Sequence, residues 1–198
     1  MSMDSGAVFL PGRGTVFTAD PGTTPFDYKT VDPRDPSTFE GWDCWGHTSR
    51  DNTVALSKDG GDSTQLGSWW DAAILDSRAP TSWSWTANSL QVDRTTMSMA
   101  FPGGEVRNGA YWVPSADRTI EKAAFILMED GSGNRMGIYL PHTPLALGDA
   151  PEIDIENFFE VQIAGSILSD DTSGDRIGFF HPKFDTTGGG SGGSGPDD

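Results

Sequence analysis

The segment KAAFILMEDGSGNRMGIYLPH, residues 122–142, contains two apolar runs separated by the turn-forming residues GSGN at 131–134. Short runs rich in Ile, Phe, Leu and Tyr that flank a Gly-containing turn are typical of a β-hairpin. We therefore predict two antiparallel strands here, KAAFILMED at 122–130 and RMGIYLPH at 135–142. The rest of the chain repeats this pattern, so the hairpin indicates the class of the whole fold.

Outside this hairpin, the clearest strand signal is TSWSWTANSLQV at 81–92. A short helix is expected to follow over 93–101, with Asp93 as its N-cap and the glycines at 103–104 as a stop signal. Further strand candidates are 14–20, 41–49, 52–70 with the turn KDGGD (58–62) at its tip, 156–168 and 176–181. With 25 Gly and 13 Pro in 198 residues, the chain is predicted to be one mainly β domain.

The two ends of the chain differ in composition from its middle. Residues 1–12 are small and polar and are predicted to form an N-terminal arm, ahead of a β domain at 13–187. The segment 188–198, GGGSGGSGPDD, is predicted to be a flexible Gly/Ser tail. Within the domain, residues 21–38 contain four prolines and are expected to form a long irregular loop.

The charge balance is strongly acidic, with a net charge of −16 from 29 acidic and 13 basic residues. Proteins that wrap DNA neutralise phosphates with Lys and Arg, so this composition argues against a DNA-binding surface. Repulsion between the acidic side chains and DNA phosphates would instead suit a passage through which DNA slides without binding. The single cysteine, Cys44, allows no internal disulfide, and neither a signal peptide nor a transmembrane segment is predicted.

The motif EIDIE at 152–156 is the one catalytic candidate. If it formed a strand, its three carboxylates would line one face, and it resembles the catalytic strand of family 16 glucanases, which are β-jelly rolls. That resemblance implies Glu152 as nucleophile, Asp154 as assistant and Glu156 as acid/base. However, positions i and i+4 of a strand lie ~13 Å apart, whereas retaining enzymes need ~5–5.5 Å between carboxyl groups. All seven tryptophans also precede the motif.

Aromatic and metal-binding residues point to no cofactor. Tryptophans could form the sugar platform of a carbohydrate-binding module, but they more often anchor cores and interfaces. The three histidines are isolated, and residues 129–137 lack the full ligand series of a calcium loop. We therefore predict no metal site and no cofactor. The tryptophans and histidines of the chain are Trp42, Trp45, Trp69, Trp70, Trp83, Trp85, Trp112, His47, His142 and His181.

Three segments together resemble the major tail protein of long-tailed actinobacterial phages. They are residues 41–74, 82–104 and 121–147, and they contain GHTS (46–49), GG (60–61), GSW (67–69), LQVD (90–93) and FPGG (101–104). The resemblance runs in order from about residue 12 to residue 181. The order and spacing of the motifs carry the resemblance, because no one of them is decisive.

The resemblance implies a tail tube subunit with no enzymatic activity. Its expected fold is a two-sheet, barrel-like β-sandwich with one short flanking helix. Six copies would form a ring, and rings would stack into a tube that first holds the tape-measure protein and later conducts double-stranded DNA. Tail-tip and tail-terminator proteins would be further partners, with assembly in the host cytoplasm and a final location in the virion tail.

The family pattern also suggests which residues make assembly contacts. The hairpin around residues 50–66 is expected to reach the next ring through salt bridges. Its charged residues are Arg50, Asp51, Lys58, Asp59 and Asp62. Four tryptophans are predicted to be subunit-interface aromatics, namely Trp42, Trp45, Trp69 and Trp70. The N-terminal arm and the proline-rich loop are further assembly candidates.

Overall fold

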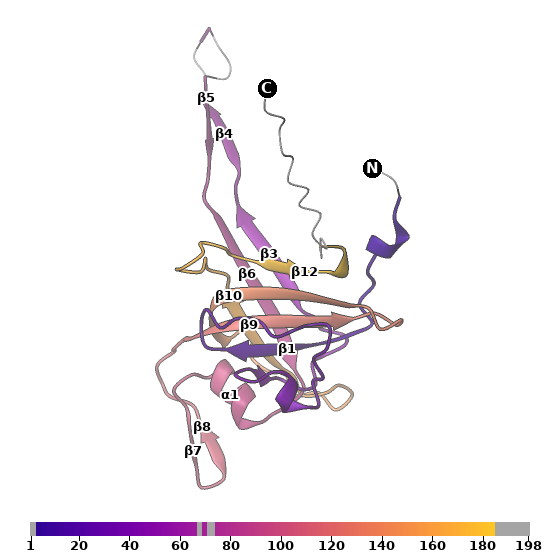
Figure 1. The fold of residues 1–198 in the computed structure, drawn as a ribbon. Helices are drawn as coiled ribbons and strands as arrows, with labels where there is room; N and C mark the ends of the chain where they lie inside the picture. The colour runs from indigo at the N-terminus through magenta and orange to yellow at the C-terminus, as the bar shows by residue number, and fades with distance from the viewer. Residues whose placement is uncertain (1–2, 67–68, 71–73, 185–198) are drawn as a thin grey trace.

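The structure is a computed structural model and describes residues 3–66, 69–70 and 74–184. The fold is mainly β with one short α-helix, as predicted (Figure 1). The strands are β1 (Arg13–Ala19), β2 (Asp43–Cys44), β3 (Ala55–Gly60), β4 (Ser63–Leu66), β5 (Leu75–Arg78), β6 (Thr81–Ser89), β7 (Glu105–Arg107), β8 (Ala110–Trp112), β9 (Ile120–Glu129), β10 (Arg135–Leu147), β11 (Val161–Ser166) and β12 (Gly178–Phe180). The helices are α1 (Arg94–Ala100) and the 3-10 turns η1 (Ser5–Ala7), η2 (Pro36–Thr38) and η3 (Pro182–Phe184).

One large antiparallel sheet has the strand order β2-β1-β9-β10-β11-β6-β3, with β12 paired to β10. Figure 1 shows β1, β9 and β10 crossing β3 and β6 steeply, so the sheet curls on itself. The curl brings its ends together: Trp45, just after β2, stacks on Trp85 of β6 with ring centroids 5.8 Å apart. The two layers expected of a sandwich are therefore made by one continuous sheet. A register shift between Leu140 and Thr143 of β10 interrupts its pairing with β9 at the bend.

The hairpin β9–β10 forms where the sequence predicts it, and it explains the long apolar run of β9. One face of β1 and β9 packs into the main core inside the curled sheet, which includes Val16, Trp85 and Ile163. The other face is covered by the proline-rich loop, whose Tyr28 and Val31 are buried against the sheet. Strands buried on both faces lose the polar alternation of a half-exposed strand. Part of the predicted assembly loop at 21–38 is thus a cover for the core.

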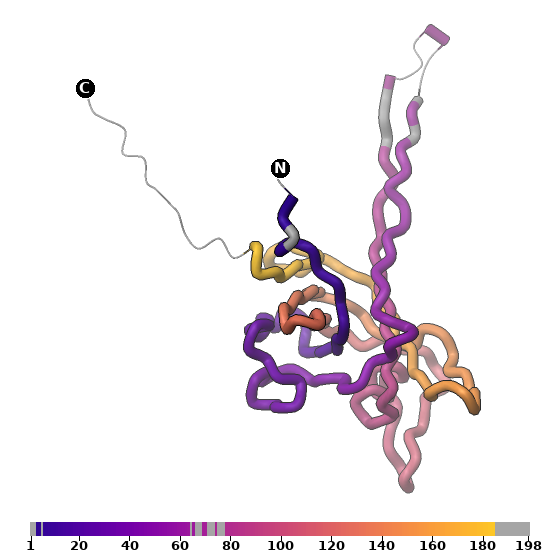
Figure 2. The backbone as a smooth tube through the Cα atoms, turned by 90° about the vertical axis from the view of Figure 1, so that its right-hand side faces the viewer, coloured from indigo at the N-terminus to yellow at the C-terminus, as the bar shows by residue number. Residues whose placement is uncertain are grey.

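A long two-stranded arm rises from the main sheet (Figures 1 and 2). Strands β3 and β6 form its base and β4 and β5 its outer part, with Gly60 paired to Thr81 and Ser63 to Arg78. The prediction that KDGGD forms the hairpin tip is wrong, because the strand continues past it. Gly60 and Gly61 have φ of +78° and +83°, and they form an irregularity inside the arm. Such backbone suits a bulge as well as a turn.

The helix prediction is confirmed, while other predicted elements are shorter than expected. The Asp93 carboxylate caps α1 by accepting a hydrogen bond from the Thr96 backbone N–H at 2.8 Å. Of the strand expected over 156–168 only β11 forms, and of that over 41–49 only β2. The N-terminal segment contacts the region of η3 through an Asp4–Lys183 ion pair of 3.0 Å. The predicted tail at 188–198 lies outside the described residues.

None of the helices in the described part of the chain has the length and apolar character needed to cross a membrane.

Candidate assembly surfaces

Two hairpins project from the sheet at opposite ends of the molecule (Figure 1). The arm ends in Trp69 and Trp70, whose side chains are fully exposed, and in the exposed Ile74. The opposite hairpin, β7–β8, exposes about half of Trp112 and stacks it under the Arg107 guanidinium at 5.4 Å. Exposed aromatic side chains are the residues that interfaces bury most often. The molecule therefore presents a candidate contact at each end.

The charged residues predicted to join rings lie along the arm and at its base. Lys58 is on β3 and stacks over the Trp83 ring at 5.9 Å. The Asp59 carboxylate accepts the Gly60 N–H at 2.8 Å. Asp62 follows in the irregular segment, while Arg50 and Asp51 precede the arm. The structure thus places three of these residues in the arm and two in the segment before β3. Their ring-to-ring salt bridges stay a prediction.

The four tryptophans predicted to be interface anchors fall into two classes. Trp42 and Trp45 are 6% and 1% exposed and pack in the cores of the single chain, so their predicted role as interface anchors gains no support from the structure. Trp45 donates its indole N–H to the Thr18 hydroxyl at 3.2 Å within the core. Trp69 and Trp70, at the arm tip, keep the exposure that an interface role requires.

Residues 148–160 form an exposed loop between β10 and β11, and the EIDIE motif lies in it. The strand that the glucanase hypothesis requires at 152–156 is therefore absent. Ile153 and Ile155 are 92% and 99% exposed, so both the apolar and the acidic side chains face solvent. The Asp154 carboxylate accepts hydrogen bonds from the Glu156 N–H at 3.0 Å and the Asn157 amide at 2.5 Å, and these bonds lower its pKa.

Glu160 fixes the end of this loop to the base of the arm. Its carboxylate accepts hydrogen bonds from the Ser49 hydroxyl at 2.6 Å and from the amides of Asn52 and Asn88 at 2.9 and 2.8 Å. Partial burial raises the pKa of Glu160, but the three hydrogen bonds outweigh that effect and leave its pKa below the ordinary value. Nothing in the local sequence marks this residue, because its partners come from two distant segments, residues 49–52 and Asn88.

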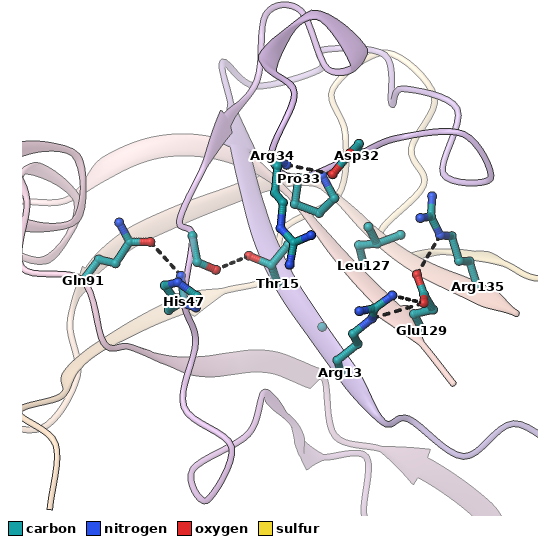
Figure 3. Close-up of a pocket in the computed structure, with 12 residues that line it drawn as sticks. Arg13, Thr15, Asp32, Pro33, Arg34, His47, Gln91, Leu127, Glu129 and Arg135 are labelled. Atoms are coloured by element: carbon teal, nitrogen blue, oxygen red, sulfur yellow. Dashed lines mark hydrogen bonds and ion pairs between the residues drawn. The ribbon is translucent and has the colours of Figure 1, made fainter. Parts of the chain in front are cut away.

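A cleft of about 460 Å³ at one end of β1, β9 and β10 is lined by arginines (Figure 3). We call it the arginine cleft; its charged lining residues are Arg13, Asp32, Arg34, Glu129 and Arg135, with His47 beside them. Glu129 pairs with Arg13 and, at 3.1 Å, with Arg135. The hydrogen bond from Arg13 and the second from Arg135 hold the pKa of Glu129 below its usual range despite the cost of desolvation.

The arginine cleft is built by tertiary structure and could not be found from a sequence motif. Arg13 begins β1, Arg135 begins β10, and Arg34 comes from the proline-rich loop. The Arg135 guanidinium also donates to the Val31 carbonyl at 2.6 Å, which ties that loop to the sheet. Within the described residues, no group of three or more His, Cys, Asp or Glu side chains could hold a metal ion.

Comparison with known proteins identifies the family. A family model described as "Phage tail tube protein" matches residues 1–184. The major tail protein Gp23 of Mycobacterium phage D29 is 29% identical over 176 residues, covering 85% of this chain and 88% of that protein. The major tail protein Gp23 of Mycobacterium phage L5 is 27% identical over the same length and the same shares of each chain. These matches confirm the resemblance to actinobacterial phage tail proteins, and the chain belongs to the phage tail tube protein family.

Proposed function

We propose that six copies of this chain form a ring, that rings stack into a hollow tail tube, and that the tube conducts the genome during ejection. A structural role in the virion tail follows from membership of the tail tube family. The ring number, the stacking contacts and the conduit role are inferred from the resemblance, the shape of the chain and its charge.

The arm is the single observation that best supports stacking. It continues past the last main-sheet pair, Gly60–Thr81, and its outer strand β4 ends at Leu66, so at about 3.3 Å per residue the paired strands extend up to ~20 Å farther. A lone two-stranded hairpin is only marginally stable in water. An arm that ends in two exposed tryptophans therefore gains most by packing on another copy. Contact between opposite ends of two copies is heterologous and repeats without closing, which generates a tube.

Contacts within a ring would use the edges of the curled sheet. The strand order ends at β2 on one side and β3 on the other, and both are edge strands of the main sheet. Open edges expose unpaired backbone groups, and joining the sheets of neighbouring copies around a ring would satisfy them. This arrangement would join the sheets of all copies in a ring into one continuous inner barrel.

The charge of the chain suits a conduit. A net charge of −16 per copy makes the tube surface repel phosphates, so DNA would pass without binding. Before ejection the lumen would hold the tape-measure protein, and the tube would end at tail-tip and tail-terminator proteins. Assembly would take place in the host cytoplasm.

Catalysis is not part of this proposal. The glucanase hypothesis depended on a strand at 152–156, and that segment is an exposed loop. A sugar platform would need several tryptophans on one surface, whereas Trp42, Trp45 and Trp85 are in the interior.

Negative-stain electron microscopy of the purified, concentrated full-length chain tests the proposal. Sixfold rings or hollow tubes are the expected result. Rings of another symmetry would refute the ring number alone. Compact monomers at every protein and salt concentration, with and without tail-tip proteins, would contradict self-assembly.

A further inference from the structure

The arginine cleft holds a positive charge that the described part of the chain does not neutralise. Glu129 is shared between Arg13 and Arg135, and Asp32 accepts the backbone N–H of Arg34 at 3.0 Å. The Arg34 guanidinium extends from the loop towards the floor of the cleft beside Thr15 (Figure 3). No ion pair of Arg34 occurs among the described residues. Three arginines against two carboxylates leave a cleft suited to one more carboxylate.

A surface of opposite charge lies on the loop between β10 and β11. We call residues 149–156 the acidic loop; its carboxylates are Asp149, Glu152, Asp154 and Glu156, and it contains no basic residue. Ile153 and Ile155 stand exposed between these carboxylates. The hydrogen bonds to Asp154 give the loop a defined turn, and Glu160 anchors its far end to the fold. Exposed apolar side chains on an ordered loop favour a contact with another surface.

The two surfaces are placed for contact between copies. Figure 2 shows the proline-rich loop, which contributes Asp32 and Arg34 to the cleft, on the left, and the loop around residue 155 on the right. In a ring, each copy is related to the next by the same rotation, so opposite sides of neighbouring copies meet. The resulting contact is heterologous and closes when the ring is complete. The long arm is directed away from both surfaces and remains available for stacking.

We propose that the acidic loop of one copy binds the arginine cleft of its neighbour in the same ring. A carboxylate of Glu152 or Glu156 pairs with Arg34, while Ile153 and Ile155 cover the pair and exclude water. Charge-assisted bonds from arginine to carboxylate are directional and can be bidentate, so they fix the angle between neighbours. The proposal rests on the ring assembly proposed above and assigns that assembly a specific lateral contact.

A charge-exchange experiment in the full-length chain tests the contact. Variant R34E and variant E152R/E156R are each expected to raise the protein concentration needed for ring formation at least tenfold at physiological salt. The triple variant, which restores opposite charges, is expected to recover most of that loss. R94E is the matched control, because it makes the same charge change at an exposed site away from the cleft. Sedimentation velocity measures assembly, and thermal unfolding checks that each variant is folded.

A binding assay with a peptide gives a readout that does not require rings. A labelled peptide of residues 149–157 is titrated with the full-length chain and followed by fluorescence anisotropy. The peptide is expected to bind the wild-type chain, and R34E is expected to weaken that binding at least tenfold. A peptide with Glu152 and Glu156 changed to Lys should not bind. These results would support the contact even if rings of six do not form. Wild-type assembly with no peptide binding and no effect of R34E would overturn it. Displacement of the peptide by inorganic phosphate at equal concentration would likewise overturn it in favour of a phosphate site.

Discussion

Replacing Trp69 by alanine is the sharpest test of the stacking role of the arm. The side chain is fully exposed in the single chain, so the free energy of unfolding of the W69A protomer should lie within about 0.5 kcal/mol of the wild-type value. If the tip packs on the next ring, the same change removes a buried aromatic anchor from every arm in the tube. Rings should then form normally while tubes do not.

The expected loss follows from the area of the side chain. A tryptophan buries about 150–250 Å², which at ~25 cal/mol per Å² corresponds to an upper bound of roughly 4–6 kcal/mol. Measured alanine substitutions at interface anchors more often cost about 2–4 kcal/mol. Since each 1.4 kcal/mol is about a factor of ten in affinity, even the lower figure weakens a single arm contact more than tenfold. Because every copy in a ring contributes one arm, the losses of free energy add up and weaken the contact between two rings much more.

Tube length and the protein concentration at which tubes appear, measured by electron microscopy and light scattering, provide the assay. Val92→Ala is the control, because Val92 is also an exposed apolar residue but lies between β6 and α1, away from the arm. Tubes of W69A with wild-type length at wild-type concentration would refute the reasoning and remove the arm tip from the interface.

Three further predictions address the arm, the core and the loop anchor. Replacing residues 61–80 by Asn-Gly should close a two-residue hairpin between the paired residues Gly60 and Thr81, so rings persist without tubes in electron micrographs; tubes would contradict the role of the arm. Trp45→Ala should lower the free energy of unfolding by about 3–5 kcal/mol in a denaturant titration, whereas a loss below 1 kcal/mol would contradict its core position. Because the pKa of Glu160 is lowered in the folded state, its contribution to stability is present above the ordinary glutamate pKa of about 4.3 and is lost as the pH falls through the lower folded value. Glu160→Gln should therefore reduce the difference in melting temperature between pH 7 and pH 3; an unchanged difference would exclude that contribution.

The parts of the fold that the sequence predicts are those decided by neighbouring residues. The β9–β10 hairpin follows from two apolar runs around GSGN, and α1 follows from Asp93 as an N-cap ahead of a Gly stop. Strand β6 follows from the alternation around Trp85. In each case the signal and the contact lie within one short segment, so no knowledge of the tertiary structure is needed.

The errors arise where the same local signal has two structural outcomes. Two adjacent glycines permit positive φ, and the fold uses Gly60 and Gly61 for an irregularity in a strand that continues. A tryptophan can anchor a core or an interface, and only the path of the curled sheet places Trp45 against Trp85. The arginine cleft has no local signal at all, because its three arginines come from segments that only the folded chain brings together.

The EIDIE segment has a strand-like pattern but forms a loop, and this difference supports the proposed contact between copies. Its alternation of Ile153 and Ile155 with carboxylates predicts a half-buried strand, but a strand needs a partner for its backbone groups, and the preceding Pro151 lacks an N–H to donate. In the single chain the segment is therefore a loop, and both isoleucines remain exposed. Exposed isoleucines on an ordered loop cost solubility unless something covers them. In a protein of the tail tube family, the covering surface to test first is a second copy, and the arginine cleft is the described surface with the complementary charge.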